Sequence, residues 1–258
     1  MTGRPLLAAR ELTKIYGDVI AVENVDLTVH AGEIFGLLGP NGAGKTTTVT
    51  MCCGLLRPTS GSVSIDGVDM ERDPRGAKRL IGYVPDEPDL YDKLSAREFI
   101  QLMGELYGVR GDVGKRTEHL LKYFDLLEAG DDLIGGYSHG MKQKTALCGM
   151  LIHEPDLLFL DEPTVGLDPK SARLLKDRLQ SMAADGRAVV LCTHILEIAQ
   201  AICDRVAILE RGRILAEGTL EDLRESVHAG RDETLEDIFL RLTGGEEDQS
   251  VARALLTP

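Results

Sequence analysis

The chain has 258 residues, 43% of them hydrophobic, so it can build a sizeable core. It carries 42 acidic and 29 basic residues, and its net charge of -13 disfavours nucleic acid and anionic membrane surfaces as partners. Because it has no secretory leader and no apolar run of about 18 residues, we expect it not to enter a membrane by itself. Its cysteines show no metal-ligand spacing, so we expect reduced, buried thiols of a cytosolic protein: Cys52, Cys53, Cys148, Cys192 and Cys203.

The first third of the chain is strand-rich. Residues 5–35 alternate apolar and polar side chains, which predicts half-buried antiparallel strands. The apolar run IFGLL, 34–38, predicts a strand covered on both faces, and a helix is expected in KTTTVTMCCGLL after it. Further strands are expected within 57–67 and at 80–84.

From residue 95 to about 153 the apolar spacing is helical, opening with Ser95 and Glu98 in capping-box spacing, and this predicts a helical insert. Strands and helices then alternate through LLFLDEP, AVVLCTH and RVAILERGRILAEG, with helices expected from Asp168, from 195 and after Thr219. Such alternation predicts a parallel sheet with flanking helices.

The segment from 229 to the end is acidic and contains one amphipathic helix at about 233–242, which predicts a small cap or a dimer contact. Only the last dozen or so residues are expected to be weakly ordered.

The stretch GPNGAGKTT, 39–47, fits the pattern G-x-x-x-x-G-K-[ST]. In this pattern backbone N–H groups surround phosphates, Lys45 reaches the terminal ones and the Thr46 hydroxyl is a magnesium ligand. A buried strand leads into the stretch and a helix leads out, as the pattern requires. The loop comprises Gly39, Pro40, Asn41, Gly42, Ala43, Gly44, Lys45, Thr46 and Thr47.

Two further strands end in polar residues. LLFLDEP ends with Asp161 and Glu162, which places two carboxylates at the carboxyl edge of the sheet. We expect Asp161 to bind magnesium directly or through a ligand, and Glu162 to orient and polarise the attacking water. The alternative is a helix start whose carboxylates only complement the helix dipole. LCTHILE ends with His194, which can donate a hydrogen bond to a terminal phosphate or serve only as a loop residue.

A second stretch, YSHGMKQK at 137–144, places a hydroxyl residue and a glycine before a basic helix. A helix N-terminus of this kind holds an anion. One nucleotide needs only one phosphate cradle, so the presence of two requires an explanation.

Taken together and in this order, the motifs resemble those of the nucleotide-binding subunit of an ABC transporter. The resemblance covers about 5–225 and comprises Tyr16 before the first strands, the Walker A loop 39–47, the Walker B strand 157–162, the D-loop 166–168 and the switch histidine His194. It implies an α/β fold: a P-loop NTPase (RecA-like) core with an antiparallel β subdomain and an inserted α-helical subdomain. The implied nucleotide-binding domain spans 1–228, with the helical insert at about 86–153, and a C-terminal extension follows at 229–258.

The resemblance also explains the second anion site. Two chains of this family pack head to tail on ATP binding, so Ser138, His139, Gly140 and the helix after them would face the terminal phosphate held by the other chain. His139 itself is interpreted as a solvated side chain. The implied cofactors are ATP and Mg²⁺, with Glu162, His194 and Lys45 as catalytic residues.

Other roles follow from the same resemblance. Tyr16 would stack on adenine, although a lone tyrosine is otherwise a core residue. Asp168 would belong to the D-loop, and the magnesium ligands would be Thr46, Asp161 and Asp86.

The sequence departs from the family pattern at two places. Asp86 in YVPDEPDLY stands where the family has the Q-loop glutamine, and we hypothesise that Asp86, or Glu87 after a one-residue shift, keeps the metal role with altered coupling. His139 and Met141 replace the usual glycine and glutamine of the signature. This signature and TLEDIFLRLTG resemble bacterial export systems whose membrane subunits are separate chains.

We therefore expect an ATP-hydrolysing subunit that powers export, bound to transmembrane permease subunits on the inner face of the cell membrane. The alternatives are a soluble, non-transport ABC ATPase of the translation or DNA-repair type, and a degenerate cassette that binds ATP without turnover. The negative charge argues against nucleic acid as a partner. Neither the cargo nor the number of membrane subunits follows from the residues, because the family binds its cargo in the membrane chains.

Overall fold

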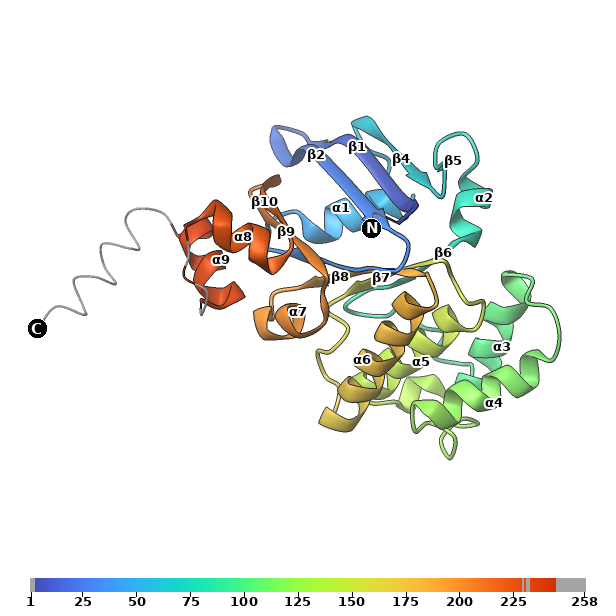
Figure 1. Ribbon diagram of the computed structural model, residues 1–258. Coiled ribbons are helices and arrows are strands. Elements are labelled where there is room, and N and C mark those ends of the chain that lie inside the picture. Colours follow the sequence, from blue (N-terminus) through green and yellow to red (C-terminus); the bar gives the residue numbers. More distant parts are fainter. Residues whose placement is uncertain (1–2, 229, 231–232, 245–258) are drawn as a thin grey trace, which may run out of the picture.

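Two β-sheets and the helices around them form the structure, a computed structural model that describes residues 3–228, 230 and 233–244 (Figure 1). The weak order expected of the last dozen or so residues concerns positions that lie outside the described residues. The two sheets lie one above the other in the view, with a helix between them.

The smaller sheet is antiparallel and has the strand order β2-β1-β4-β5. Its first two strands form a long hairpin whose turn contains Gly17, in agreement with the alternation in the sequence. Only the two-residue strand was not predicted, because two residues are too few to show a period. The strands are β1 (Pro5–Tyr16), β2 (Val19–His30), β4 (Ser60–Ile65) and β5 (Val68–Asp69).

The larger sheet has the order β10-β9-β3-β8-β7-β6, with all neighbours parallel except the β10-β9 pair. Every residue of β3, β7 and β8 is buried, as their unbroken apolar runs predict. The strands are β3 (Ile34–Leu38), β6 (Ile81–Val84), β7 (Leu157–Asp161), β8 (Ala188–Thr193), β9 (Arg205–Glu210) and β10 (Arg213–Gly218).

The larger sheet is covered on both faces because its strands direct alternate residues to opposite sides. Phe35 and Leu37 pack in a core shared with α1 (Lys45–Cys52) and the antiparallel sheet. Ile34, the first residue of the strand, packs instead with the helices of the opposite face. This layering places the end of β3 and the start of α1 at one edge of the sheet.

The predicted helical insert is present and packs on that opposite face (Figure 1). The Ser95–Glu98 capping box is formed at its first helix. Its helices are α3 (Ala96–Leu106), α4 (Val113–Tyr123), the 3₁₀ turn η1 (Ile134–Gly136) and α5 (His139–Leu151), and α6 (Pro169–Ala184) packs beside them. One short helix, α2 (Pro74–Arg79), was not predicted, although Asp73 caps its first turn and Pro74 begins it.

Three helices cover the edge of the sheet near β9 and β10: α7 (Leu196–Ile202), α8 (Leu220–Ser226) and α9 (Leu235–Thr243). The last of these corresponds to the amphipathic helix predicted at 233–242. Ile238 packs with Leu38 and Leu223 in one apolar cluster, and the Leu235 N–H donates to the Gln200 side-chain oxygen at 2.7 Å. The described part of the C-terminal segment is therefore anchored on α7.

The thiols are free among the described residues, as the cysteine spacing predicts. Four are buried, and Cys203 is only partly so. Burial raises the pKa of the Cys52 thiol to about 12, which keeps it protonated and unreactive. No helix in the described ranges has the length and hydropathy needed to span a membrane.

Candidate functional site

The loop after β3 holds Lys45 at its base. Gly39 has no room for a side chain, because a Cβ there would lie 2.2 Å from the Leu209 carbonyl oxygen. Gly44 adopts a left-handed φ of 105° against the Ala21 carbonyl. The buried Lys45 ammonium donates to the carbonyl oxygens of Gly39 at 2.7 Å and Pro40 at 3.1 Å. The lysine that the pattern assigns to the phosphates thus lies inside the loop.

The start of α1 joins the loop to the Walker B strand. Helix α1 begins at Lys45, so its first backbone N–H groups have no partner within the helix. The Thr46 hydroxyl donates to Asp161 Oδ2 at 2.7 Å, linking α1 to the end of β7. Free N–H groups beside a hydroxyl and a carboxylate oxygen suit a phosphate with a hard cation.

These residues share one hollow of about 220 Å³. It brings together most of the predicted phosphate and metal residues, and its lining comprises Ala21, Asn41, Gly42, Gly44, Lys45, Thr46, Thr47, Asp86, Asp161 and Glu162. Glu87 does not line it, so the geometry favours Asp86 over its neighbour in the Q-loop. The predicted loop residue Ala43 instead binds the Gly212 N–H through its carbonyl. A larger hollow of about 700 Å³, around Met51 and Met70, contains no predicted site residue.

Carboxylates concentrate negative charge in this hollow. Burial raises the pKa of Asp161, the nearby Glu162 and Asp86 add to the rise, and the Thr46 hydrogen bond opposes it. A cation here would relieve both the burial and the repulsion. In the described part of the chain no three His, Cys, Asp or Glu side chains converge as a metal site, so a bound cation would need Thr46 or ligand oxygens to complete its shell.

Glu162 is held by the end of the neighbouring strand β8. Its Oε1 accepts the backbone N–H of His194 at 2.9 Å and lies 2.7 Å from the His194 Nδ1. Its Oε2 accepts the Thr193 hydroxyl at 2.9 Å. The sequence predicted Glu162 and His194 as catalytic residues but not their contact. It gave no role to Thr193, whose only signal was a hydroxyl residue directly before the histidine.

Tyr16 lies apart from the hollow, at the end of β1. The residue is 49% exposed, and the Lys14 ammonium lies 5.2 Å from the ring centroid. Ala21, just beyond the same hairpin turn, does line the hollow. The exposed side chain leaves the ring accessible to a planar partner.

The signature residues lie at the exposed start of α5, away from the hollow. Ser138 caps this helix by accepting the Met141 N–H at 3.3 Å, and both Ser138 and His139 are exposed. His139 packs against Gly166, and a Cβ on Gly140 would lie 2.6 Å from the Gly166 carbonyl. Within one chain the signature therefore packs against the D-loop, and its helix N-terminus stays open.

Asp168 ends the D-loop as the cap of α6. Its carboxylate accepts the Ser171 N–H at 2.9 Å and the Ser171 hydroxyl at 2.6 Å. These hydrogen bonds lower the pKa of Asp168. The carboxylate is thereby ionised and fixes the direction in which the D-loop enters α6.

The family model described as ABC transporter matches residues 22–165. The ABC transporter ATP-binding protein NatA of Bacillus subtilis (strain 168) is 40% identical over 224 residues, which are 86% of this chain and 90% of that protein. The probable multidrug ABC transporter ATP-binding protein YbhF of Escherichia coli (strain K12) is 39% identical over 243 residues, 93% of this chain. The chain spans only 42% of the length of YbhF.

Solved structures show the same fold. An ATP-binding subunit of an ABC transporter superposes with a TM-score of 0.88 at 35% identity, covering 92% of this chain and 99% of that one. The ATP-binding cassette MJ0796, solved as a dimer in a post-hydrolysis state bound to ADP and Pi, superposes with a TM-score of 0.77 at 28% identity, covering 83% of this chain and 98% of that one. The predicted P-loop NTPase fold, with its antiparallel subdomain and helical insert, is thereby confirmed.

Proposed function

Since this chain belongs to the ABC transporter family of ATP-binding proteins, we propose that it is the ATP-hydrolysing subunit of an export system whose membrane subunits are separate chains. The observation that carries the proposal is the convergence of Lys45, Thr46, Asp161 and Glu162 on one hollow, with His194 bound to Glu162. Relatives named as transporter ATP-binding proteins favour this function over a soluble, non-transport ABC ATPase.

In this proposal the loop 39–47 binds the phosphates of ATP and the exposed ring of Tyr16 stacks on adenine. Thr46, Asp161 and Asp86 would hold Mg²⁺, which supplies positive charge that neutralises the phosphate oxygens. Three oxygen-bearing side chains that line one hollow suit this hard cation.

Glu162 acts as the base of the hydrolysis. It orients the attacking water and takes its proton. Lys45 and His194 donate hydrogen bonds to the oxygens of the terminal phosphate, on which negative charge develops. The contact between Glu162 and His194 supports this division of roles, because both side chains lie at the ends of adjacent strands.

The complete site needs a second copy of the chain. Ser138, His139 and Gly140 would meet the terminal phosphate held by the partner copy in a head-to-tail dimer, with Asp168 close to the contact. The exposed N-terminus of α5 supports this arrangement, because it has N–H donors and lies outside the hollow of its own chain. The dimer of the related cassette MJ0796 is consistent with it.

The chain would work on the inner, cytoplasmic face of the membrane, bound to permease subunits through the helical insert at about 86–153. We assign 1–228 to the nucleotide-binding domain and 229–258 to a C-terminal extension. The net charge of -13 supports a protein partner over a nucleic acid.

The substitution Glu162→Gln tests the proposal. With Mg²⁺ and ATP, phosphate release is expected to fall about 100-fold or more, because an amide cannot accept the proton. Light scattering should then show an ATP-dependent mass twice that of the monomer. Unchanged hydrolysis in a monomer would contradict both the role of Glu162 and the composite site.

A further inference from the structure

The two oxygens of the Glu162 carboxylate have different kinds of partner. Oε1 is bound entirely by His194, through the backbone N–H at 2.9 Å and Nδ1 at 2.7 Å. Oε2 is bound by the Thr193 hydroxyl at 2.9 Å. Glu162 is 8% exposed, so the bulk of its hydration has been replaced by these contacts.

Thr193 and His194 differ in their freedom to move. Thr193 is 1% exposed and ends β8, which pairs with β3 and β7 on both sides. His194 follows Thr193 directly and lies beyond the strand, and its side chain is 52% exposed. The histidine can turn to another partner, whereas the threonine cannot leave its place without opening the sheet.

The hydroxyl of Thr193 has a defined direction. Its oxygen accepts the Ile195 N–H at 3.0 Å, and its single hydrogen points to Glu162 Oε2. A hydroxyl held as an acceptor on one side is pre-organised as a donor on the other.

Glu162 also needs an external anchor. Its backbone adopts a left-handed φ of 47°, which is costly for a residue with a side chain. Its N–H donates to the Cys192 carbonyl at 2.9 Å, so the end of β8 fixes the backbone as well as the carboxylate. A strained backbone alone would not determine where the long side chain points.

We propose that Thr193 is a positioning residue for the ATPase: it fixes Oε2 of Glu162 and leaves Oε1 as the oxygen that exchanges His194 for the attacking water. This inference rests on the proposed function, in which Glu162 is the base. It assigns a function to a buried hydroxyl that takes no part in phosphate binding.

The test compares Thr193→Val, which keeps the shape and removes the hydroxyl, with Thr193→Ser, which keeps the hydroxyl. In the full chain with Mg²⁺-ATP, we expect Thr193→Val to lower kcat about 10-fold or more with KM changed less than about twofold, because the base is misaligned while ATP contacts are intact. Thr193→Ser should restore kcat to within about threefold of the parent. ATP-dependent dimerisation should persist in both variants.

Thr117→Val is the matched control, since Thr117 is also buried and its hydroxyl has no partner among the described residues. It should leave kcat unchanged. Parent-like kcat in a folded Thr193→Val, or equal losses in the Val and Ser variants, would overturn the proposal.

If Thr193→Val does not fold, as judged by circular dichroism, Thr193→Ala replaces it. Failure of both variants to fold would assign Thr193 to stability alone and overturn the positioning role.

Glu162→Gln distinguishes failure of the proposed function from failure of the role given to Thr193. Hydrolysis by Glu162→Gln at the parent rate would refute the proposed function. An inactive Glu162→Gln beside a fully active Thr193→Val would refute only the role of Thr193.

Discussion

Asp86 lines the site at the position where the resemblance to the family implies a glutamine. The carboxylate lines the same hollow as Thr46 and Asp161, whereas the adjacent Glu87 does not. An ionised oxygen binds a hard divalent cation more strongly than an amide does, but it adds negative charge beside the phosphates. In the proposed site, Asp86 would therefore attract Mg²⁺ more strongly than an amide would, and it would also repel the phosphates more.

Asp86→Asn removes this charge without changing the size of the side chain. We expect the Mg²⁺ concentration for half-maximal ATP hydrolysis to rise roughly 3- to 10-fold, because one charged ligand becomes neutral. Steady-state phosphate release over a Mg²⁺ titration measures it. Glu87→Gln is the control and should leave the titration unchanged. An equal shift in both variants would mean that Asp86 acts only through the overall negative charge of the loop and not as a metal ligand.

At the scale of elements, two helices of the insert begin with a serine cap but differ in surroundings. Ser138 caps α5 and is exposed, whereas Ser95 caps α3 and is buried beside Glu98. Both hydroxyls accept a backbone N–H three residues later, at 3.3 Å and 3.2 Å. The same local chemistry thus serves an open helix end and a closed one.

Replacing each cap by alanine separates stability from function. Ser138→Ala and Ser95→Ala should each lower the free energy of unfolding by about 1 kcal/mol. Only Ser138→Ala should also lower ATP hydrolysis and ATP-dependent dimerisation, by about 10-fold, because its hydroxyl and helix end would face the partner's phosphate. Urea unfolding and phosphate release give the two readouts, and equal activity losses would argue against a signature role for α5.

His153 joins three elements, because it follows α5 and contacts the end of α3 and the strand β6. Its ring stacks on Tyr107 at a centroid distance of 3.7 Å, and Nε2 lies 3.1 Å from the Ile81 carbonyl oxygen. The other nitrogen, Nδ1, is buried without a hydrogen-bond partner among the described residues. Burial lowers the pKa of His153 below its ordinary value of 6.5, although the Ile81 contact opposes the shift.

The folded state therefore resists protonation of His153, and the unfolded state binds the proton first. Its contribution to stability is complete above pH 6.5 and is lost as the pH falls from 6.5 through the lower folded value. Urea unfolding of His153→Gln at pH 7.5 and 5.5 should show a smaller acid destabilisation than the parent. The exposed His119→Gln should match the parent; a parent-like slope in His153→Gln would show that other groups cause the acid loss.

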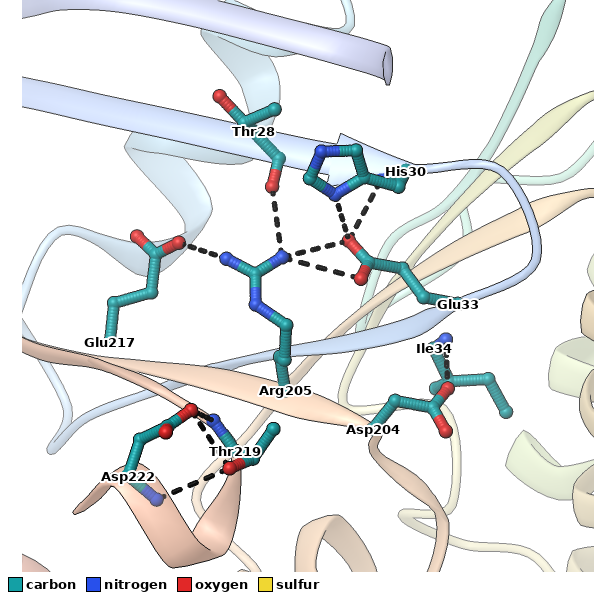
Figure 2. A network of polar contacts seen from close by, with 9 residues as sticks. All are labelled: Thr28, His30, Glu33, Ile34, Asp204, Arg205, Glu217, Thr219 and Asp222. Carbon is teal, nitrogen blue, oxygen red and sulfur yellow. Dashed lines mark hydrogen bonds and ion pairs between the residues drawn. The ribbon is translucent and has the colours of Figure 1, made fainter. Parts of the chain in front are cut away.

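At the scale of the whole molecule, a polar network joins the two sheets at the end remote from the phosphate loop (Figure 2). Arg205 of β9 donates to both oxygens of Glu33, at 3.1 Å and 3.3 Å, and contacts Glu217 of β10. It also reaches the Thr28 carbonyl of β2 at 3.4 Å. The partners come from positions 28 to 217, so the network links segments that are far apart in the sequence.

Arg205→Met should lower the free energy of unfolding by roughly 2 kcal/mol, because it removes the arginine that pairs with Glu33, and the Glu33 side chain is only 12% exposed. The control Arg213→Met breaks another pair between the sheets, with Glu23, but its side chains are 64% and 36% exposed, so water replaces the contact at little cost. Thermal unfolding compares them. Equal losses would show that burial does not determine the contribution of the network.

Local sequence determined much of this protein. The loop 39–47, the buried strands at 34–38 and 157–161 and the Ser95 cap each depend on neighbouring residues, so period, glycine placement and capping chemistry predicted them. The edge of the sheet at which Lys45, Asp161 and His194 gather also followed, because parallel strands end together.

The tertiary structure alone decided which of these groups touch. Strand order and register bring Thr193 as well as His194 to Glu162. They also decide that Asp86 and not Glu87 lines the hollow, and that Arg205 bridges to Glu33. The residues that touch lie far apart in the sequence, and Asp86 and Glu87 are neighbours in one loop. A local pattern does not encode the distance between two segments that only the packed sheet brings together.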